Sequence, residues 1–325
     1  MKVLVTGATG FLGRSVVKAL AERGHDVVAM ARPAAALPSE SSERITYIRG
    51  DLRQRGDWVD RINGVEAVVH AAAAVGGSFP EQFAGTVVAT ENLLDNIDWN
   101  TLRRFVLISS FSVYDYARGP SRMDERHPLE ADPSRRDAYT WTKMLQEDLV
   151  ERTCKKHEIP FVSIRPGAIY GPGKDWDAGS ALSAGKFDLL FSPLARMRLT
   201  HVDNCADAIA AAVEAEGATG AFNIVDDEQP THARYHSLCR RAGAPIGRAI
   251  YIPWWLAATA GLGVKLINTA FFKKGARLPE ILDYPRQRAR WKGYSYSNAR
   301  AKQELGWTPR VRLADAVPRM FGANS

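Results

Sequence analysis

Apolar residues in the first part of the chain occur in two patterns, short continuous runs and longer stretches at helical spacing. The continuous runs predict buried strands, over 2–6, 26–30, 45–49, 67–70, 105–109, 161–165 and 222–225. Apolar residues three and four positions apart predict helices, over 14–23, 56–62, 81–97 and 138–157. Strands that alternate with helices are typical of an α/β fold with a Rossmann-type, doubly wound parallel sheet.

The alternation becomes irregular after residue 170, and the strand at 222–225 returns to the sheet. We therefore expect two unequal parts. A nucleotide-binding Rossmann domain comprises residues 1–170 plus 200–225. A smaller, mostly helical substrate-binding lobe comprises residues 171–199 plus 226–325.

Residues 249–264 are uncharged and include two adjacent tryptophans, and the apolar character continues to Phe272 after an interruption at Lys265. Each piece is too short to span a bilayer comfortably, and proline and glycine break the pattern. We expect a buried helical cap over the substrate pocket. The alternative is a weak peripheral membrane contact, in which the basic residues around Lys273 lie beside the apolar face.

The segment Thr6–Gly13 joins the first strand to the first helix and has glycine at positions 7, 10 and 13. Gly7 permits a tight turn, Gly10 lets a pyrophosphate approach the backbone, and Gly13 lets the helix lie close to the strand. Free N–H groups at the start of the helix bind phosphate. A glycine pattern in this strand–turn–helix context predicts dinucleotide binding.

Charge is distributed unevenly over the 325 residues, whose net charge is +7. Residues 240–312 hold 15 of the 43 basic residues and 3 of the 36 acidic ones, a net charge of +12. This indicates an anionic partner, either a substrate phosphate, a carrier phosphopantetheine or an anionic membrane; the alternative is a solvated basic face. We expect no nucleic-acid partner.

Three widely spaced cysteines show no metal-ligand spacing, so we expect reduced thiols and no metal site. The first strand is predicted to begin at residue 2, so we expect no signal peptide. Both observations favour a cytoplasmic protein.

Tyr139 and Lys143 are four residues apart in a predicted helix and therefore share a face. The pKa of a phenol is about 10. A nearby ammonium and an oxidised nicotinamide lower it, so the pair can exchange a proton with a substrate alcohol or carbonyl. The serines at 109, 110 and 112 end a predicted strand, where open α/β sheets bind ligands. One of them can polarise the substrate oxygen, while the others satisfy turn backbone.

The end of the second strand bears on the choice of cofactor. An NAD site normally has Asp or Glu there to bind the ribose hydroxyls, but Ala31 occupies that position and Arg32 follows. A guanidinium suits a 2′-phosphate, so the sequence favours NADP(H), with NAD(H) as the alternative. Arg32 could instead stack on adenine or point into solvent.

Together these motifs resemble the extended short-chain dehydrogenase/reductases of the NAD-dependent epimerase/dehydratase superfamily, particularly the 3β-hydroxysteroid dehydrogenase and dihydroflavonol reductase branch. The resemblance covers essentially the whole chain. The matching segments are 6–13, 50–52, 70–73, 109–114, 139–143, 165–172, 201–203 and 297–309.

The resemblance implies that Ser110 is the catalytic serine beside Tyr139 and Lys143. It implies that Lys143 also binds the nicotinamide ribose, that Asp51 accepts a hydrogen bond from the adenine amino group, and that Leu52 packs on the adenine ring. It also implies a homodimer. Together with Arg32, the expected cofactor-binding residues are Gly7, Thr9, Gly10, Phe11, Leu12, Gly13, Asp51, Leu52, Ala71, Ala72, Ala73, Tyr139, Lys143, Pro166, Gly167 and Ile169.

The chain departs from the family pattern at four positions near the pocket. Asp115 replaces a glycine, and Thr86 stands where many members have asparagine. Phe111 and Ser112 stand where dehydratases have an Asp-Glu pair, which argues against dehydration.

We expect a reductase or dehydrogenase acting on the hydroxyl/carbonyl group of an apolar substrate, because residues 165–172 contain no asparagine to hold a sugar-nucleotide diphosphate. The alternatives are a nucleotide-sugar epimerase with transient oxidation and a non-catalytic, cofactor-sensing protein.

Overall fold

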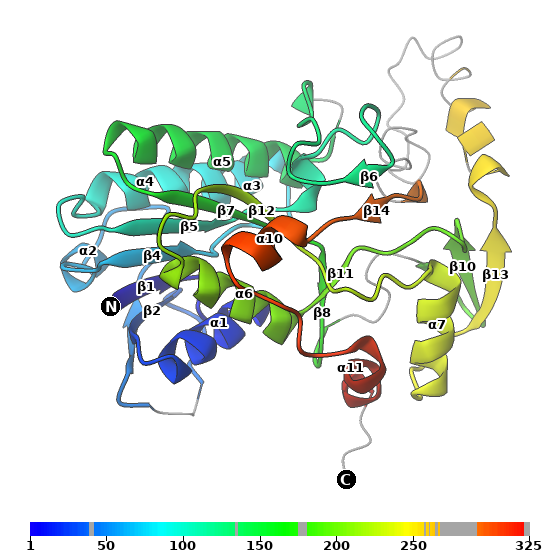
Figure 1. The fold of residues 1–325 in the computed structure, drawn as a ribbon, viewed down its shortest axis with the longest axis horizontal. Helices are drawn as coiled ribbons and strands as arrows, with labels where there is room; N and C mark the ends of the chain where they lie inside the picture. The colour runs from blue at the N-terminus through cyan, green and yellow to red at the C-terminus, as the bar shows by residue number, and fades with distance from the viewer. Residues whose placement is uncertain are drawn as a thin grey trace.

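The core of the molecule is a seven-stranded parallel sheet with helices on both faces, seen in the computed structural model in Figure 1. The structure describes residues 1–38, 42–133, 136–174, 181–256, 258–259, 261–263, 266 and 291–321. The strands lie in the order β12 (Gly220–Ile224), β7 (Phe161–Pro166), β5 (Arg104–Ile108), β4 (Ala67–His70), β1 (Lys2–Thr6), β2 (Asp26–Ala31) and β3 (Ile45–Arg49). The predicted strands and the doubly wound fold are confirmed.

Successive side chains of the central strand β1 point to opposite faces of the sheet, because a strand has a period of two. Val3 and Val5 pack into one apolar layer, and Leu4 packs into the other. A strand buried on both faces needs an unbroken apolar run, which is why the sequence pattern identified it. The chain turns away in opposite directions after β1 and β4, and the gap between their carboxyl ends is the switch point where such sheets bind ligands.

One face of the sheet is covered by three helices, α1 (Phe11–Glu22), α6 (Val202–Glu214) and α10 (Ala299–Glu304). The other face is covered by α2 (Trp58–Arg61), α3 (Phe79–Phe83), α4 (Ala89–Asn96) and α5 (Ala138–Lys156). Two predicted helices differ in detail. The helix expected over 56–62 is the single turn α2, and the one expected over 81–97 is α3 and α4 joined by a π-helical turn, Ala84–Val88.

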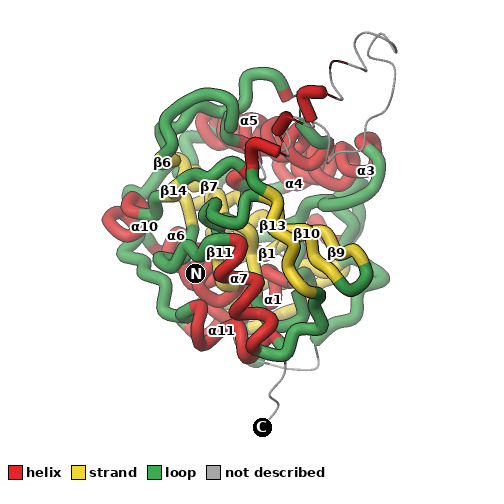
Figure 2. The backbone as a smooth tube through the Cα atoms, turned by 90° about the vertical axis from the view of Figure 1, so that its right-hand side faces the viewer, coloured by secondary structure: helices red, strands yellow, loops and turns green. Residues whose placement is uncertain are grey.

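A second lobe lies beside the sheet at the right of Figure 1, and it faces the viewer in Figure 2. It contains a three-stranded sheet in the order β13 (Arg248–Ile252), β10 (Phe187–Phe191) and β9 (Ala181–Ala184), together with α7 (His232–Arg241) and α11 (Leu313–Met320). Two short strand pairs lie between the two halves. They are β8 (Ala168–Tyr170) with β11 (Leu199–His201), and β6 (Arg122–Met123) with β14 (Ser295–Tyr296).

The expected buried helical cap over 249–264 is helical in the described residues from 254 onward, but its beginning is not a helix and large apolar side chains in it are exposed. Its beginning is strand β13, which lies at the edge of its sheet. Trp255 and Leu266 follow with 66% and 70% of their surface exposed. A short apolar run does not distinguish a buried helix from an edge strand. Positions 257, 260, 264–265 and 267–272 lie outside the described residues.

Candidate functional site

The glycine turn between β1 and α1 is shaped so that side chains cannot enter it. Gly7 has φ +67°, and a Cβ there would lie 2.9 Å from the backbone nitrogen of Ala72 on β4's loop. A Cβ on Gly13 would lie 2.1 Å from the carbonyl oxygen of Gly7. The turn is therefore a close backbone cradle at the N-terminus of α1, as a dinucleotide pyrophosphate requires.

A cavity of about 320 Å³ opens beside this turn at the switch point between β1 and β4. Its lining includes most of the residues expected at the adenosine and pyrophosphate end of the cofactor, namely Gly7, Thr9, Gly10, Arg32, Asp51, Leu52, Ala71, Ala72 and Ala73. These residues come from the loops after β1, β2, β3 and β4. The shape and backbone character of the site fit a nicotinamide dinucleotide.

Arg53 also lines this cavity, and sequence reasoning missed it. Its guanidinium forms an ion pair with the Asp51 carboxylate, with Nη2 2.6 Å from Oδ2 and Nε 3.0 Å from Oδ1. The hydrogen bonds from Arg53 hold the pKa of Asp51 below its usual range. The cavity wall therefore presents two guanidinium groups, on Arg32 and Arg53, beside one carboxylate.

The remaining expected cofactor residues are not in the lining of this cavity. Phe11, Leu12 and Gly13 form the first turn of α1. Pro166 ends β7, and Ile169 lies in β8. Between them, the N–H of Gly167 donates to the carbonyl of Ile224 at 3.0 Å, and a Cβ at Gly167 would meet the Arg198 carbonyl oxygen at 2.4 Å. The backbones at Gly167 and Arg198 therefore lie so close together that only glycine fits at position 167.

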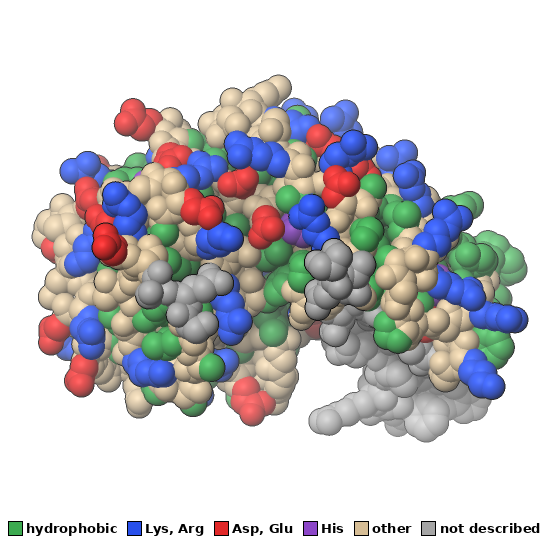
Figure 3. Space-filling model, turned by 90° about the horizontal axis from the view of Figure 1, so that it is seen from below, with side chains coloured by type: hydrophobic (Ala, Val, Ile, Leu, Met, Phe, Trp, Pro, Cys, Tyr) green, Lys and Arg blue, Asp and Glu red, His purple; other side chains and the backbone are tan. Residues whose placement is uncertain are grey.

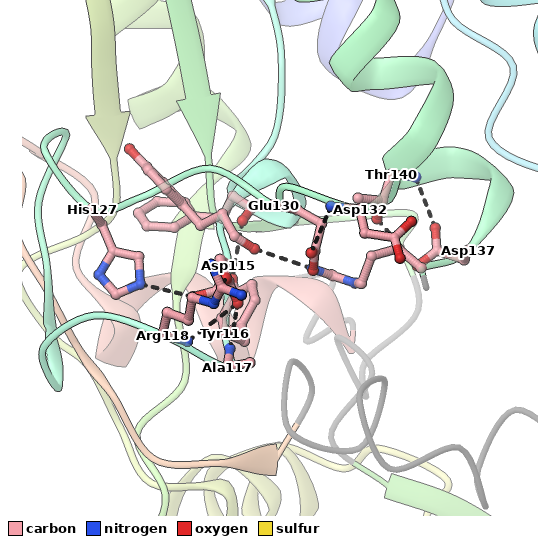
Figure 4. A network of polar contacts seen from close by, with 12 residues as sticks. Asp115, Tyr116, Ala117, Arg118, His127, Glu130, Asp132, Asp137 and Thr140 are labelled. Carbon is pink, nitrogen blue, oxygen red and sulfur yellow. Dashed lines mark hydrogen bonds and ion pairs between the residues drawn. The ribbon is translucent and has the colours of Figure 1, made fainter. Parts of the chain in front are cut away.

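Polar contacts fix the segment that precedes α5, over the described residues 114–133 and 136–137, and Figure 4 shows them. Asp115 turns inward, and its carboxylate accepts from the backbone N–H of Ala117 at 2.7 Å. His127 Nε2 contacts the Asp115 carbonyl at 3.0 Å. Asp137 caps α5 by accepting from the N–H of Thr140 at 2.8 Å. Asp115, which departs from the family's glycine, therefore helps to fix the loop that leads into the helix of Tyr139.

Tyr139 lies in the first turn of α5. Burial raises the pKa of Tyr139, whereas the neighbouring Ser110 side chain lowers it and the Asp137 carboxylate raises it further. The expectation that Lys143 and an oxidised nicotinamide together lower this pKa stays a prediction. In the chain without a nicotinamide, burial raises the pKa of Tyr139 above that of an ordinary phenol, so the phenol is protonated at neutral pH.

Lys143 is buried and its ammonium points into the protein. Nζ donates to the carbonyl of Ile108 at 2.7 Å and to Oε1 of Gln146 at 2.9 Å. Burial lowers the pKa of Lys143 to about 7, although the Glu147 carboxylate favours the charged form. Lys143 can therefore gain or lose a proton near neutral pH.

The three serines after β5 have different surroundings. Ser110 Oγ accepts from the N–H of Ser112 at 3.1 Å and caps the short 3₁₀ turn Phe111–Val113. Ser109 is directed inward and donates to the carboxylate of Glu147, which also forms a buried ion pair with Arg165. Ser109 is therefore a buried anchor, and Ser110 is the serine that meets Tyr139.

Within the described residues, no group of three or more His, Cys, Asp or Glu side chains could hold a metal ion. Cys154, Cys205 and Cys239 are buried and unpaired. None of the described helices is long and apolar enough to cross a membrane.

The chain is similar in sequence to a family of NAD-dependent enzymes and to two reductases. Residues 3–225 match the family described as "NAD dependent epimerase/dehydratase family". A "3-diazoavenalumate denitrifying reductase" from Streptomyces sp is 30% identical over 95% of this chain and 96% of its own length. A "2-alkyl-3-oxoalkanoate reductase" from Stenotrophomonas maltophilia is 26% identical over the full length of both chains.

Solved structures share the fold at lower identity. UDP-glucuronic acid 4-epimerase from Bacillus cereus, in complex with NAD, superposes with a TM-score of 0.73 at 21% identity, covering 99% of this chain and 96% of that one. The structure named gox2253 reaches a TM-score of 0.78 at 21% identity, covering 98% and 96%.

Proposed function

Because the chain belongs to the NAD-dependent epimerase/dehydratase family, we propose that it is a dehydrogenase or reductase acting on the hydroxyl/carbonyl group of an apolar substrate. The observation that carries the proposal is the placement of Tyr139 and the buried Lys143 one turn apart on α5, with the Ser110 side chain close enough to shift the pKa of Tyr139. A hydroxyl donor, a second hydroxyl and an ammonium together are what proton transfer to a carbonyl oxygen needs.

The chemistry follows from the state of each side chain. A bound nicotinamide supplies or accepts the hydride. In the direction of reduction, the Tyr139 phenol donates its proton to the carbonyl oxygen while Ser110 holds that oxygen by a hydrogen bond. The raised pKa of Tyr139 keeps the phenol protonated at neutral pH, which is the state that reduction requires of the donor. Lys143 restores the proton to Tyr139, because its own pKa is about 7.

We favour NADP(H) as the cofactor. Arg32 and Arg53 line the same cavity, and β2 ends in Ala31 without an acidic side chain to bind ribose hydroxyls. Arg49 fixes the loop that carries Arg32, since its Nη1 donates to the carbonyl of Ala35 at 3.1 Å. NADH is the competing cofactor in the same cavity.

An apolar substrate is favoured over a nucleotide sugar. The reductases from Streptomyces and Stenotrophomonas match along nearly the whole chain, and so does a "3-beta-hydroxysteroid dehydrogenase" from Mycolicibacterium neoaurum, at 27% identity over 97% of this chain and 89% of its own. The epimerase structures, at about 21% identity, support the fold.

The experiment is an NADPH and NADH consumption screen over ketoesters, steroids, flavonoids and nucleotide sugars, with the Tyr139→Phe variant run in parallel. Consumption that depends on a ketone and is lost in the variant supports the proposal. Interconversion of a nucleotide sugar with no added cofactor and no net consumption would instead identify an epimerase.

We also propose that the second lobe makes a weak contact with anionic membrane surfaces. Tyr251, Trp255 and Leu266 expose between 54% and 70% of their surface. Lys186 and Arg248 are exposed at the adjacent ends of β10 and β13, which pair with each other. Figure 3 shows hydrophobic and basic side chains next to each other at this end of the molecule. Exposed apolar groups beside cations suit a membrane interface.

A further inference from the structure

A continuous chain of buried polar side chains connects the glycine turn with Lys143. It consists of Thr6 on β1, His70 on β4, Thr90 on α4, and Gln146 and Lys143 on α5. The distances are 2.7 Å from Thr6 Oγ1 to His70 Nδ1, 2.8 Å from His70 Nε2 to Thr90 Oγ1, 2.8 Å from Gln146 Nε2 to Thr90 Oγ1, and 2.9 Å from Lys143 Nζ to Gln146 Oε1. Sequence reasoning did not find Gln146 or Thr90.

The position of each hydrogen in this chain follows from its partners. The Thr90 hydroxyl donates to the carbonyl of Thr86 at 2.6 Å, so its oxygen accepts from both His70 and Gln146. His70 therefore carries its hydrogen on Nε2, and its Nδ1 accepts from the Thr6 hydroxyl. A neutral ring is required, and burial with the charge of Lys143 lowers the pKa of His70 to about 3.

The orientation of the Gln146 amide is fixed from both sides. An ammonium only donates hydrogen bonds, so the amide oxygen must face Lys143. The amide nitrogen faces Thr90 and also contacts the carbonyl of Ala72 at 3.4 Å, in the wall of the cofactor cavity. Gln146 therefore joins the wall of the cavity directly to the ammonium.

This arrangement limits how many hydrogen bonds the Lys143 ammonium can still donate. Two of its three N–H groups are used by Ile108 and Gln146 within the described part of the chain. One N–H is left for the cofactor ribose or for Tyr139. Since the Ile108 carbonyl is fixed in β5, the side-chain contact that sets the rotation of the ammonium is the one with Gln146.

We propose that Gln146 is a positioning residue, which orients the Lys143 ammonium toward the cofactor through its contacts with Thr90 and the cavity wall. The role rests on the proposed function, in which Lys143 serves the cofactor and Tyr139. It predicts opposite effects for two substitutions. Gln146→Met removes the acceptor that favours the ammonium, which lowers the pKa of Lys143. Gln146→Glu places a carboxylate there, which raises it.

Other charged groups near Lys143 would not give opposite shifts of its pKa in the two variants. Glu147 lies on the same helix, and its charge is paired with Arg165 on β7. His70 on β4 is neutral at any pH above about 3. Thr90 on α4 does not titrate. Both substitutions at 146 leave these groups in place.

The test measures the affinity of the full-length protein for NADH between pH 5.5 and 9 by nucleotide fluorescence, without substrate. NADH is used because the 2′-phosphate of NADPH itself titrates in this range. Affinity should fall with a midpoint near pH 7 as Lys143 loses its proton, and Lys143→Met should lose this dependence. Leu145→Met, a neighbour on the same helix outside the polar chain, is the matched control.

We expect the midpoint to move down by about one pH unit in Gln146→Met and up by about one in Gln146→Glu, since a hydrogen bond to a charged group is worth that much. A loss of packing alone would move both variants in the same direction or neither, and either result would overturn the role. Should Gln146→Met not fold, a midpoint in Gln146→Glu at or below that of Leu145→Met overturns it.

The two proposals fail separately in this design. A protein that turns over ketones but shows unmoved midpoints keeps the reductase function and loses the role of Gln146. A protein that shows the opposite shifts but consumes no NAD(P)H with any ketone keeps the role of Gln146 toward the cofactor and loses the reductase function.

Discussion

Two regions of the molecule contrast with each other, a buried polar network in the nucleotide-binding half and a group of exposed apolar side chains in the second lobe. In the first half, Thr6, His70, Thr90 and Gln146 are completely buried and hydrogen-bonded to one another. In the second lobe, large apolar side chains such as Trp255 and Leu266 face solvent. A buried polar network is stable only when every member is paired, so it fixes one geometry. Exposed apolar surface is instead available to a ligand or a surface.

This difference assigns separate roles to the two regions. The first half must hold a cofactor and a proton donor in one geometry, whereas the second lobe is free to adapt to a particular substrate. Substitutions in the first half should therefore act on chemistry and cofactor affinity. Substitutions in the second lobe should act on association.

The largest expected effect is that of Tyr139→Phe. The ring still packs, but the proton donor is lost, so turnover should fall by about 10²–10⁴-fold while cofactor affinity changes little. Steady-state kinetics and NADPH titration measure the two quantities. Turnover within threefold of the parent would remove Tyr139 from the role of proton donor.

Gly13→Ala tests the rigidity of the first half. The new Cβ would lie 2.1 Å from the Gly7 carbonyl oxygen, so the turn must shift. We expect a loss of about 1–3 kcal/mol in the free energy of unfolding, together with weaker NADPH binding. The control is Gly263→Ala in the second lobe, where no atom of the described residues lies within 4 Å of the added carbon. Equal losses in the free energy of unfolding for the two substitutions would contradict the greater rigidity of the first half.

Arg32→Ala tests the choice of cofactor. If the guanidinium binds a 2′-phosphate, the ratio of kcat/KM for NADPH over NADH should fall by about tenfold, because charge-assisted hydrogen bonds are lost. The rate with NADH should hardly change. A parent ratio below one, or an unchanged ratio in the variant, would favour NAD(H).

The smallest expected effect concerns the second lobe. Binding to anionic vesicles should weaken by about fivefold in Trp255→Ser, and added salt should release the parent protein. Val75→Ser removes an exposed apolar side chain from the first half and should leave vesicle binding unchanged. Absence of parent binding to anionic vesicles would leave the basic residues as a solvated face. A KM that rises steeply with salt would indicate a phosphorylated substrate.

The parts of the fold that could be predicted are those with a local signal. Val3–Val5 is an unbroken apolar run, and Gly7, Gly10 and Gly13 follow it directly, so strand, turn and cofactor site all have a signature within thirteen residues. Tyr139 and Lys143 are one helical turn apart.

The missed features depend on contacts between distant parts of the chain. Gln146 meets Thr90 across 56 positions of sequence, and no local pattern marks either residue. Arg53 follows Asp51 closely, but its position in the cavity depends on how β3 lies beside β2. In β13 the five residues Arg248–Ile252 are too few to show a period, so the pairing with β10 decides their structure.

The π-helical turn Ala84–Val88 makes the length of the chain between α3 and α4 critical. It includes Thr86, whose hydroxyl accepts from the N–H of Ala74 at 3.0 Å and whose carbonyl accepts from Thr90. A π-turn holds one residue more than an α-turn. Deleting that residue would rotate α4 by about 100° and carry Thr90 away from His70. The half-buried positions of this turn can therefore tolerate substitution, whereas an insertion or deletion would break the contact of Thr90 with His70.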